Sequence, residues 1–544
     1  MMLKELFQRF KWMIVLASCL STLSAFAGIS MLSMITDVIG ALQSGKLEAA
    51  YSFGAFVLAV LVVMFAGVIS QFILLRMSSI SVYEIQKTLL QRILSTNYEK
   101  IERIGGHRIM ATMQRDVSIL ARGLMLMPTF IYSSVTVFLC LAYMLYTSWQ
   151  LFLFVVLAVS LIIVVAKTTL HYAMSHQSLL REYVDAFFAN LQALTNGGKE
   201  INLNSNRRRH FYHLVMLPLF QSIQKKTVKS ELLLVSAESF TGTLIFFLIG
   251  SIVYGAHYFL HGVAIEVVVA FVLVVLYMVD PLKNVVSIVA DVNEVRVSLN
   301  KIEKLELSEA KDFLLPPNSD KAHKGHFNKI TLNNICFRYR DCDLQDGYVF
   351  SIGPISAELK AGEIVFVTGG NGSGKSTFAK LLVGLYDLDS GSIHLDDKLV
   401  GTDLSLEQYK NNISVIFSDF FIFHQLLDNE GEPASDDAVI SLLQLLKLDG
   451  KVSSKNGLLS STDLSQGQRK RLALLQSSLC DASICVYDEW AAEQDPKFKD
   501  YFYNNLLPQL KELGKIIIII SHDEHYFHKA DQILKFEEGL LVAS

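Results

Sequence analysis

Gly369-Gly-Asn-Gly-Ser-Gly-Lys-Ser-Thr377 directly follows the apolar run Glu363-Ile-Val-Phe-Val-Thr368. The apolar run is typical of a buried strand, and the glycines allow backbone N–H groups to turn inward around phosphates. The loop leads into a helix that begins near Lys375, where the helix dipole also favours anions. A strand, a glycine loop and a helix in this order predict a phosphate-binding P-loop in an α/β sheet domain.

Two side chains of the loop have separate expected roles. Lys375 places a mobile positive charge beside the β- and γ-phosphates, and the hydroxyl of Ser376 can bind Mg²⁺. We therefore expect ATP and Mg²⁺ as cofactors. The residues expected to bind the nucleotide through the loop are Gly369, Gly370, Asn371, Gly372, Ser373, Gly374, Lys375, Ser376 and Thr377.

Two more apolar runs end in residues suited to phosphate chemistry. Asp488 closes the run that begins at Ser483, and His522 follows the run Lys515-Ile-Ile-Ile-Ile-Ile-Ser521. Because the carboxyl ends of parallel strands meet at one edge of a sheet, we expect Asp488 to reach the Mg²⁺ shell. Glu489 can then polarise the attacking water as general base, and His522 can contact the γ-phosphate or that water.

The chain as a whole is too apolar for an ordinary soluble enzyme, so part of it is expected to lie in lipid. Only 18% of the 544 residues are charged, and the mean hydropathy is +0.38. Six apolar runs are long enough to cross a bilayer, at about 12–39, 51–77, 124–149, 151–170, 232–260 and 263–290. The sequence predicts an all-α six-helix transmembrane domain over 1–310, a linker at 311–325 and the α/β P-loop domain over 326–544.

The loops between the spans alternate between short and long. The long loops 76–122 and 171–231 hold nearly all the Lys and Arg residues that lie between the spans. The positive-inside tendency therefore places these loops, both termini and the P-loop domain in the cytoplasm. Each long loop contains a glycine break, at Ile104-Gly-Gly-His107 and Thr195-Asn-Gly-Gly-Lys199. These breaks are either helical-hairpin turns that touch another domain or ordinary exposed turns.

Charge also limits the expected partners. Acidic and basic residues nearly balance, 52 against 48, so nothing points to a nucleic acid. Glu238 and Asp280 lie inside or near the spans, where charge is costly and tends to face a cavity. Asp280 precedes Pro281 and can instead lie at a kink, and Glu238 can lie at the interface, so a role in the substrate pathway stays open.

Leu464-Ser-Gln-Gly-Gln468, together with the P-loop and the acids at 488–489, makes residues 326–544 resemble the nucleotide-binding domain of ATP-binding cassette (ABC) transporters. In that family this signature contacts the ATP held by the partner domain. The resemblance implies this trans role for Leu464, Ser465, Gln466, Gly467 and Gln468. Tyr339 matches the family's adenine-stacking aromatic residue, with Phe337 as the alternative, and Asp495 matches the aspartate of the interface loop.

Residues before the linker resemble the six-span domain of ABC exporters in span number and loop lengths. One membrane domain fused to one nucleotide-binding domain is similar to a half-transporter. The resemblance implies a homodimer, unless another half-transporter is the partner, in the bacterial inner (plasma) membrane.

A finer resemblance is to bacterial cyclic-peptide exporters, including siderophore-precursor and microcin exporters. Asp488-Glu-Trp-Ala-Ala-Glu-Gln-Asp-Pro496 and Val415-Ile-Phe-Ser-Asp-Phe420 are similar to their sequences. The wider family has a glutamine at the position of Ser418, where it contacts Mg²⁺. With the shorter Ser418, either the loop lies closer to the metal or Asp419 takes part.

The resemblance implies ATP-driven export of an amphipathic peptide-like substrate by alternating access. A lipid flippase or a siderophore importer on the same scaffold is the alternative within transport. An ATP-gated regulatory membrane protein without pumping is the alternative from another class.

Overall fold

The computed structural model describes residues 2–44, 53–259, 264–309, 327–339, 350–428 and 430–543. These residues form two compact units, one of residues 1–90 with 107–306 and one of residues 91–106 with 307–544. The predicted linker and the predicted domain start at residue 326 lie outside the described residues. The same holds for 45–50 and 261–262 in the predicted short loops.

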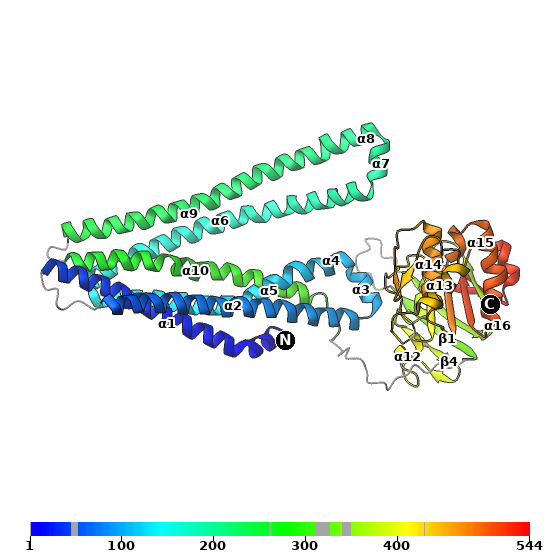
Figure 1. Ribbon diagram of the computed structural model, residues 1–544. Helices are drawn as coiled ribbons and strands as arrows, with labels where there is room; N and C mark the ends of the chain where they lie inside the picture. The colour runs from blue at the N-terminus through cyan, green and yellow to red at the C-terminus, as the bar shows by residue number, and fades with distance from the viewer. Residues whose placement is uncertain are drawn as a thin grey trace. The chain divides into compact units, whose positions relative to one another are not determined.

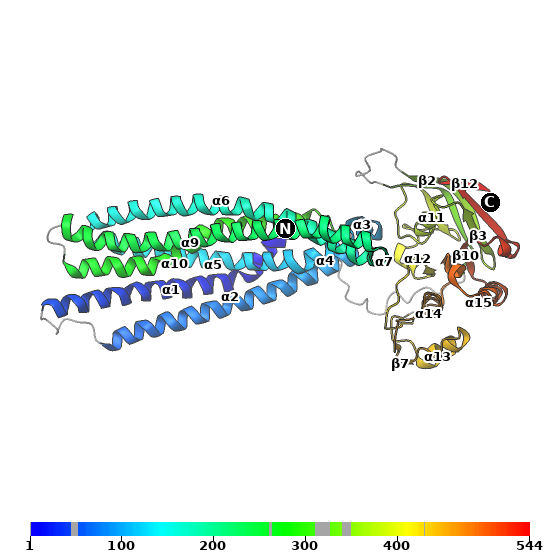
Figure 2. The ribbon, with the colours of Figure 1, turned by 90° about the horizontal axis from the view of Figure 1, so that it is seen from above.

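Six long helices account for most of the described residues of the six predicted spans (Figures 1 and 2). They are α1 (Met2–Ser44), α2 (Phe53–Ser95), α5 (Val117–Thr147), α6 (Trp149–Asn196), α9 (Leu217–Phe259) and α10 (Ile265–Glu303). The third predicted span, 124–149, runs past Thr147, where its helix ends. Among the described residues, four stretches are long and apolar enough to cross a membrane: Gln8–Leu42, Phe53–Ser95, Arg108–Thr147 and Ile265–Ile288. In α6 and α9 the described apolar stretches, Trp149–Val165 and Gly242–Ala256, are shorter.

The helical unit is held together by apolar packing and hydroxyl pairs. Helix α10 packs along α5, and α6 packs along α9. The Ser21 and Ser70 hydroxyls lie 2.7 Å apart and join α1 to α2, while Thr36 Oγ1 lies 3.1 Å from the Tyr143 hydroxyl of α5. Large apolar side chains remain exposed on the outer faces, as expected for helices that lie in lipid.

The glycine breaks interrupt the helices at the predicted positions. Gly105, with φ of 82°, separates α3 (Tyr98–Ile104) from α4 (Gly106–Ala111). Gly197 ends α6, before α7 (Gly198–Leu203) and α8 (Ser205–His210). Single π-helical turns follow at Thr112–Asp116 and Phe211–Met216. Of the two acidic residues noted in or near the spans, Asp280 is exposed, and its carboxylate lies 3.8 Å from Lys283 Nζ. The Glu238 side chain lies outside the described residues.

The second unit is the predicted α/β domain. Its main sheet has the order β12-β11-β3-β10-β9-β6, with parallel pairing throughout except for the edge strand β12. The strands are β3 (Ile364–Gly369), β6 (Ile413–Ile416), β9 (Ile484–Asp488), β10 (Ile516–Ile520), β11 (Gln532–Glu537) and β12 (Leu540–Ala543). A second sheet contains β1 (Lys329–Arg338), β2 (Ser351–Lys360), β4 (Ser390–Leu395) and β5 (Lys398–Leu399).

Helices cover both faces of the main sheet, so its central strands are buried on each side. Val365 and Val367 of β3 face a core layer with Phe378, while Phe366 faces the opposite layer with Tyr503. The α-helices are α11 (Lys375–Leu382), α12 (Leu406–Lys410), α13 (Asp436–Leu445), α14 (Gln466–Ser478), α15 (Pro496–Tyr501) and α16 (Leu507–Glu512). This arrangement brings the ends of β3, β9 and β10 to one edge, as predicted.

Candidate functional site

The P-loop joins β3 to α11 and requires glycine at its first position. Gly369 has a φ of 145°, and a Cβ there would lie 2.3 Å from the Phe536 carbonyl oxygen. The Lys375 ammonium donates hydrogen bonds to the carbonyl oxygens of Gly369 at 3.0 Å and Gly370 at 2.9 Å. The lysine therefore lies within the loop that the sequence predicts to hold phosphates.

Asp488 lies at the end of β9, paired with Ile520 of β10, and is 2% exposed. Burial raises the pKa of its carboxyl group, while hydrogen bonds from the Ser376 hydroxyl and the Ser418 N–H oppose that shift. The structure thus brings together the three residues that the sequence predicts near the metal. Ser418 approaches through its backbone.

The oxygen atoms at this place fit Mg²⁺. A serine hydroxyl and a carboxylate are hard ligands, and Mg²⁺ is usually bound by one or two carboxylates together with substrate phosphates. In the described part of the chain, no group of three His, Cys, Asp or Glu residues could hold a metal alone. Ser376 and Asp488 would therefore bind a metal that also takes phosphate oxygens.

Glu489 and His522 form a pair at the same edge. Glu489 has a left-handed backbone with φ of 50°, and its N–H donates to the Ile520 carbonyl oxygen at 3.0 Å. His522 Nε2 lies 3.3 Å from Glu489 Oε1, and both side chains are about half exposed. Burial lowers the pKa of Lys375, and the negative charges of Glu489 and Asp488 oppose this shift.

Tyr339 lies beside the helix that follows the P-loop. Its hydroxyl lies 3.1 Å from Thr377 Oγ1, and its ring meets Phe337 edge-on at 5.1 Å between centroids. Phe337 is 3% exposed and belongs to the core, whereas Tyr339 is half-buried. Of these two aromatic residues, Tyr339 is the more accessible one and stays the candidate for stacking on adenine.

The signature residues lie at the start of α14, which begins at Gln466. Leu464 packs against the core, while Ser465 and Gln466 are exposed. The Ser465 N–H donates to Gln468 Oε1 at 3.3 Å. The start of a helix favours an anion through its dipole and its first N–H groups, so this place is suited to bind a phosphate.

Asp495 is bound within its own chain. Its carboxylate accepts a hydrogen bond from the Phe498 N–H at 3.0 Å, which caps α15, and it also pairs with Arg471 of α14. The hydrogen bond from Phe498 and the charge of Arg471 lower the pKa of Asp495. The sequence predicts an interface residue here, and the structure adds a link to the signature helix.

Comparisons with known proteins agree with this architecture. Residues 11–282 match the ABC transporter transmembrane region, and residues 352–492 match the ABC transporter family. The chain is 35% identical over 466 residues to ATP-binding protein SyrD of Pseudomonas syringae pv. syringae, covering 84% of this chain and 81% of the relative. This chain belongs to the ABC transporter family.

This ABC transporter also matches more distant relatives along nearly its whole length. It is 23% identical over 567 residues to ATP-dependent lipid A-core flippase of Haemophilus ducreyi, covering 98% of this chain and 92% of the relative. A solved bacterial Atm1-family ABC exporter with ATP bound has the same fold, with a TM-score of 0.71 and 16% identity over 98% of this chain and 94% of that one. The protein is an exporter-type half-transporter in which ATP hydrolysis is coupled to transport.

The sequence left open whether the break at Ile104-Gly-Gly-His107 touches another domain, but it did not predict the side-chain cluster on α3, which directly precedes this break. Glu102 of α3 accepts hydrogen bonds from Lys380 Nζ at 2.9 Å and from the Tyr386 hydroxyl at 2.6 Å, within the second unit. Tyr98 lies over Lys380, and the pKa of Tyr98 is raised by burial, then by Glu102 and Asp419. No local pattern marks these residues, because α3 precedes α11 by more than 250 residues.

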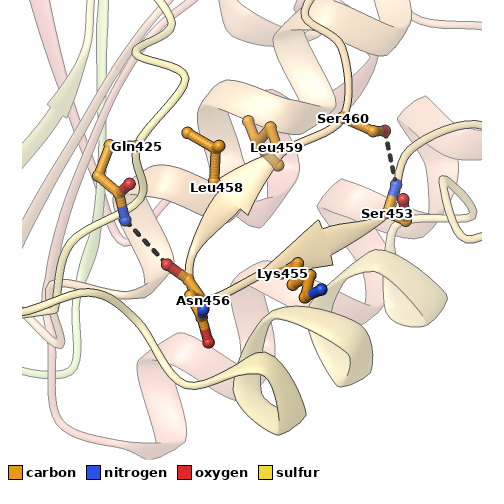
Figure 3. A pocket seen from close by; sticks show the side chains of 7 residues that line it. All are labelled: Gln425, Ser453, Lys455, Asn456, Leu458, Leu459 and Ser460. Carbon is orange, nitrogen blue, oxygen red and sulfur yellow. Dashed lines mark hydrogen bonds between the residues drawn. The ribbon is translucent and has the colours of Figure 1, made fainter.

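A pocket lies beside the hairpin of β7 (Ser454–Lys455) and β8 (Leu458–Leu459) (Figure 3). Gln425 Nε2 donates to the Asn456 carbonyl oxygen at 3.0 Å, and the Ser453 N–H donates to Ser460 Oγ at 3.1 Å. The bond from Gln425 holds the hairpin against the domain, and the bond between Ser453 and Ser460 joins the two ends of the hairpin. None of the predicted site residues lines this pocket.

Proposed function

We propose that this exporter moves an amphipathic peptide-like substrate, of cyclic-peptide or siderophore type, out across the bacterial inner membrane. The observation that carries the proposal is the run Asp488-Glu-Trp-Ala-Ala-Glu-Gln-Asp-Pro496, which resembles cyclic-peptide exporters where most exporters have serine, alanine, leucine and aspartate. Trp490 in this run is 2% exposed and packs against Phe502, with 4.5 Å between ring centroids. The unusual residue is therefore a fixed part of the core.

The membrane helices supply a second support. Residues 12–39, 53–75, 124–147, 149–165 and 242–259 contain no Lys or Arg. Hydroxyl groups such as those of Ser21, Ser70 and Ser133 account for much of the buried polarity there. Such an interior suits a neutral, hydrogen-bonding substrate better than a headgroup with several phosphates, because cations would be needed to bind the latter.

A lipid flippase is the second candidate. It is favoured by the Haemophilus ducreyi relative, whose match spans 98% of this chain. Many exposed apolar side chains on the membrane helices, among them Phe65, Phe246 and Tyr254, would also be compatible with a lipid that enters from the bilayer. The scarcity of cations in the helices makes this candidate the weaker one.

The ATP site would drive the movement through two copies of the chain. Ser465, Gly467 and Gln468 of one copy would contact the ATP on the P-loop of the other, so that ATP closes the dimer. Glu489, oriented by His522, would accept the proton of the attacking water, while Lys375 binds the phosphates. Mg²⁺, when bound by Ser376 and Asp488, would neutralise the charge that develops on the phosphates. The nucleotide-binding domains and both termini would lie in the cytoplasm.

The proposal is tested by the ATPase rate of the purified protein in liposomes. Cyclic peptides, siderophore precursors and lipid A-type lipids are added separately, and the Glu489→Gln variant serves as the inactive control. We expect the peptide-like compounds to raise the rate in a saturable way. Stimulation by lipid A-type lipids alone would replace this proposal with the flippase.

A further inference from the structure

The catalytic carboxylate and the signature are connected within one chain. Gln494 lies five residues after Glu489 and is 8% exposed. Its side-chain NH₂ donates to the Gly467 carbonyl oxygen at 3.0 Å, and its Oε1 accepts from Arg471 Nε at 3.0 Å. Gln494 thus bridges the first turn of α14 to the segment that follows the catalytic residue.

Contacts on either side fix this segment to the same helix. Trp490 Nε1 donates to the Lys470 carbonyl oxygen at 2.7 Å, and Lys470 Nζ donates to the Glu489 carbonyl oxygen at 3.0 Å. Lys470 is 4% exposed and also lies 3.4 Å from a carboxylate oxygen of Glu493. The main chain at Glu489 is therefore bound directly to the signature helix.

The amide group of Gln494 suits both of its bonds. A buried amide has a donor group and an acceptor group, and here each has one partner. A leucine at this position, which most exporters have, would leave the Arg471 Nε–H and the Gly467 carbonyl oxygen without these partners. The backbone of Gly467 also lies close to that of Glu493, because a Cβ on Gly467 would lie 3.3 Å from the Glu493 carbonyl oxygen.

We infer that Gln494 is a positioning residue for the signature. It orients the backbone of the turn at Gly467, and so it acts on the ATP bound to the partner copy's P-loop. Its effect on the site of its own Glu489 is secondary. The inference rests on the proposed homodimer, and it makes Gln494 a link between the two ATP sites.

The test uses dimers purified through two different tags, one on each copy. The reference dimer has Glu489→Gln in one copy, which leaves one site with an intact Glu489. In the first test dimer, Gln494→Met is in the other copy, where its signature completes the disabled site. In the second, Gln494→Met is in the same copy as Glu489→Gln, where its signature completes the intact site.

We expect the first test dimer to keep the ATPase rate of the reference. The second should fall on the order of tenfold, as for the loss of one or two hydrogen bonds in a productive site. Gln509→Met on α16, where the side chain is exposed, is the matched control and should not change the rate in either position. Gln494→Glu keeps the acceptor but loses the donor to Gly467. When it is placed in the same copy as Glu489→Gln, it should lower the ATPase rate partly or as far as Gln494→Met does.

Three outcomes overturn the inference. A loss in the first arrangement alone would place Gln494 at its own Glu489, and equal losses in both would indicate a general structural role, checked by the thermal unfolding midpoint. Failure of the two tagged copies to purify together would overturn the homodimer and this inference with it. If the two tagged copies purify together but the ATPase rates do not follow the expected pattern, the inference about Gln494 is overturned while the homodimer stands.

Discussion

The imidazole Nε2 of His522 lies 3.3 Å from Oε1 of Glu489, at the ends of two adjacent parallel strands. This contact orients the carboxylate beside Asp488 and the P-loop without burying it. An accessible, oriented carboxylate is what a water-activating base requires.

Replacing Glu489 with glutamine should leave ATP binding intact and reduce hydrolysis about 100-fold or more, because the amide cannot accept the proton of water. Binding is measured with a fluorescent ATP analogue and hydrolysis by phosphate release. Lys375→Ala is the contrasting variant and should weaken binding. Near-normal turnover of the Glu489→Gln variant would remove Glu489 from its role as base.

Ser376 and Ser418 should respond differently to alanine. Ser376 reaches Asp488 through its hydroxyl, whereas Ser418 does so through its backbone N–H, which alanine retains. We expect Ser376→Ala to raise the Mg²⁺ concentration for half-maximal ATPase activity on the order of tenfold, the effect of losing one ligand interaction of about 1.4 kcal/mol. Ser418→Ala should leave it nearly unchanged. An equal shift in both variants would show that the Ser418 hydroxyl also holds the metal.

Glu102→Gln should weaken the response to substrate more than basal ATPase activity. The substitution removes the charge that pairs with Lys380 and weakens the acceptor of the Tyr386 hydroxyl, while α3 remains joined to α2 and α4. The exposed fraction of Glu102 is 40%, so the effect on stability should be at most about 1 kcal/mol. The ratio of stimulated to basal rate is the readout.

Glu99→Gln on the same helix is the control for that ratio. A drop in basal rate equal to the drop in stimulated rate would show that Glu102 supports the fold of the ATP site and not the response.

Asp531→Asn should reduce stability at neutral pH and remove part of its dependence on acid. Burial raises the pKa of Asp531, but hydrogen bonds from Lys511 at 2.6 Å and 2.7 Å and from the Ile364 N–H at 2.8 Å outweigh it, so the pKa is lowered. Because the folded state favours the ionised form, its contribution is present above the ordinary pKa of about 3.9 and is lost as pH falls through the lowered value.

The thermal unfolding midpoint checks this expectation. The wild-type protein should exceed Asp531→Asn at pH 7, and the gap should close as pH falls below about 4. A gap that does not change with pH would contradict the assignment.

The ATP-binding edge was predictable from the sequence, because it depends on local patterns. Short β-branched runs end at Gly369, Asp488 and Ser521, and parallel pairing brings such ends together. The sequence could not decide between Phe337 and Tyr339 as the adenine-stacking residue. Their difference arises because Phe337 points into the core between the two sheets and the P-loop helix.

Contacts between distant segments were not predictable. Gln494 meets Gly467 across 27 residues, and Glu102 meets Lys380 across 278. Nothing in the local sequence of either partner selects the other, since the meeting depends on how whole helices pack. The continuation of the long helices into the loops was predictable, because the loop sequences are also typical of helices, and α2 continues to Ser95 after its apolar run ends near Met77.

Hydrolysis at Glu489 is proposed to drive export of a peptide-like substrate. The direct measurement is uptake of a radiolabelled cyclic peptide, chosen from the ATPase screen, into inside-out membrane vesicles. We predict uptake that requires ATP and is abolished by Glu489→Gln but not by the Gln509→Met control. Uptake that proceeds equally well in the Glu489→Gln vesicles, or movement of the peptide in the opposite direction, would contradict this proposal.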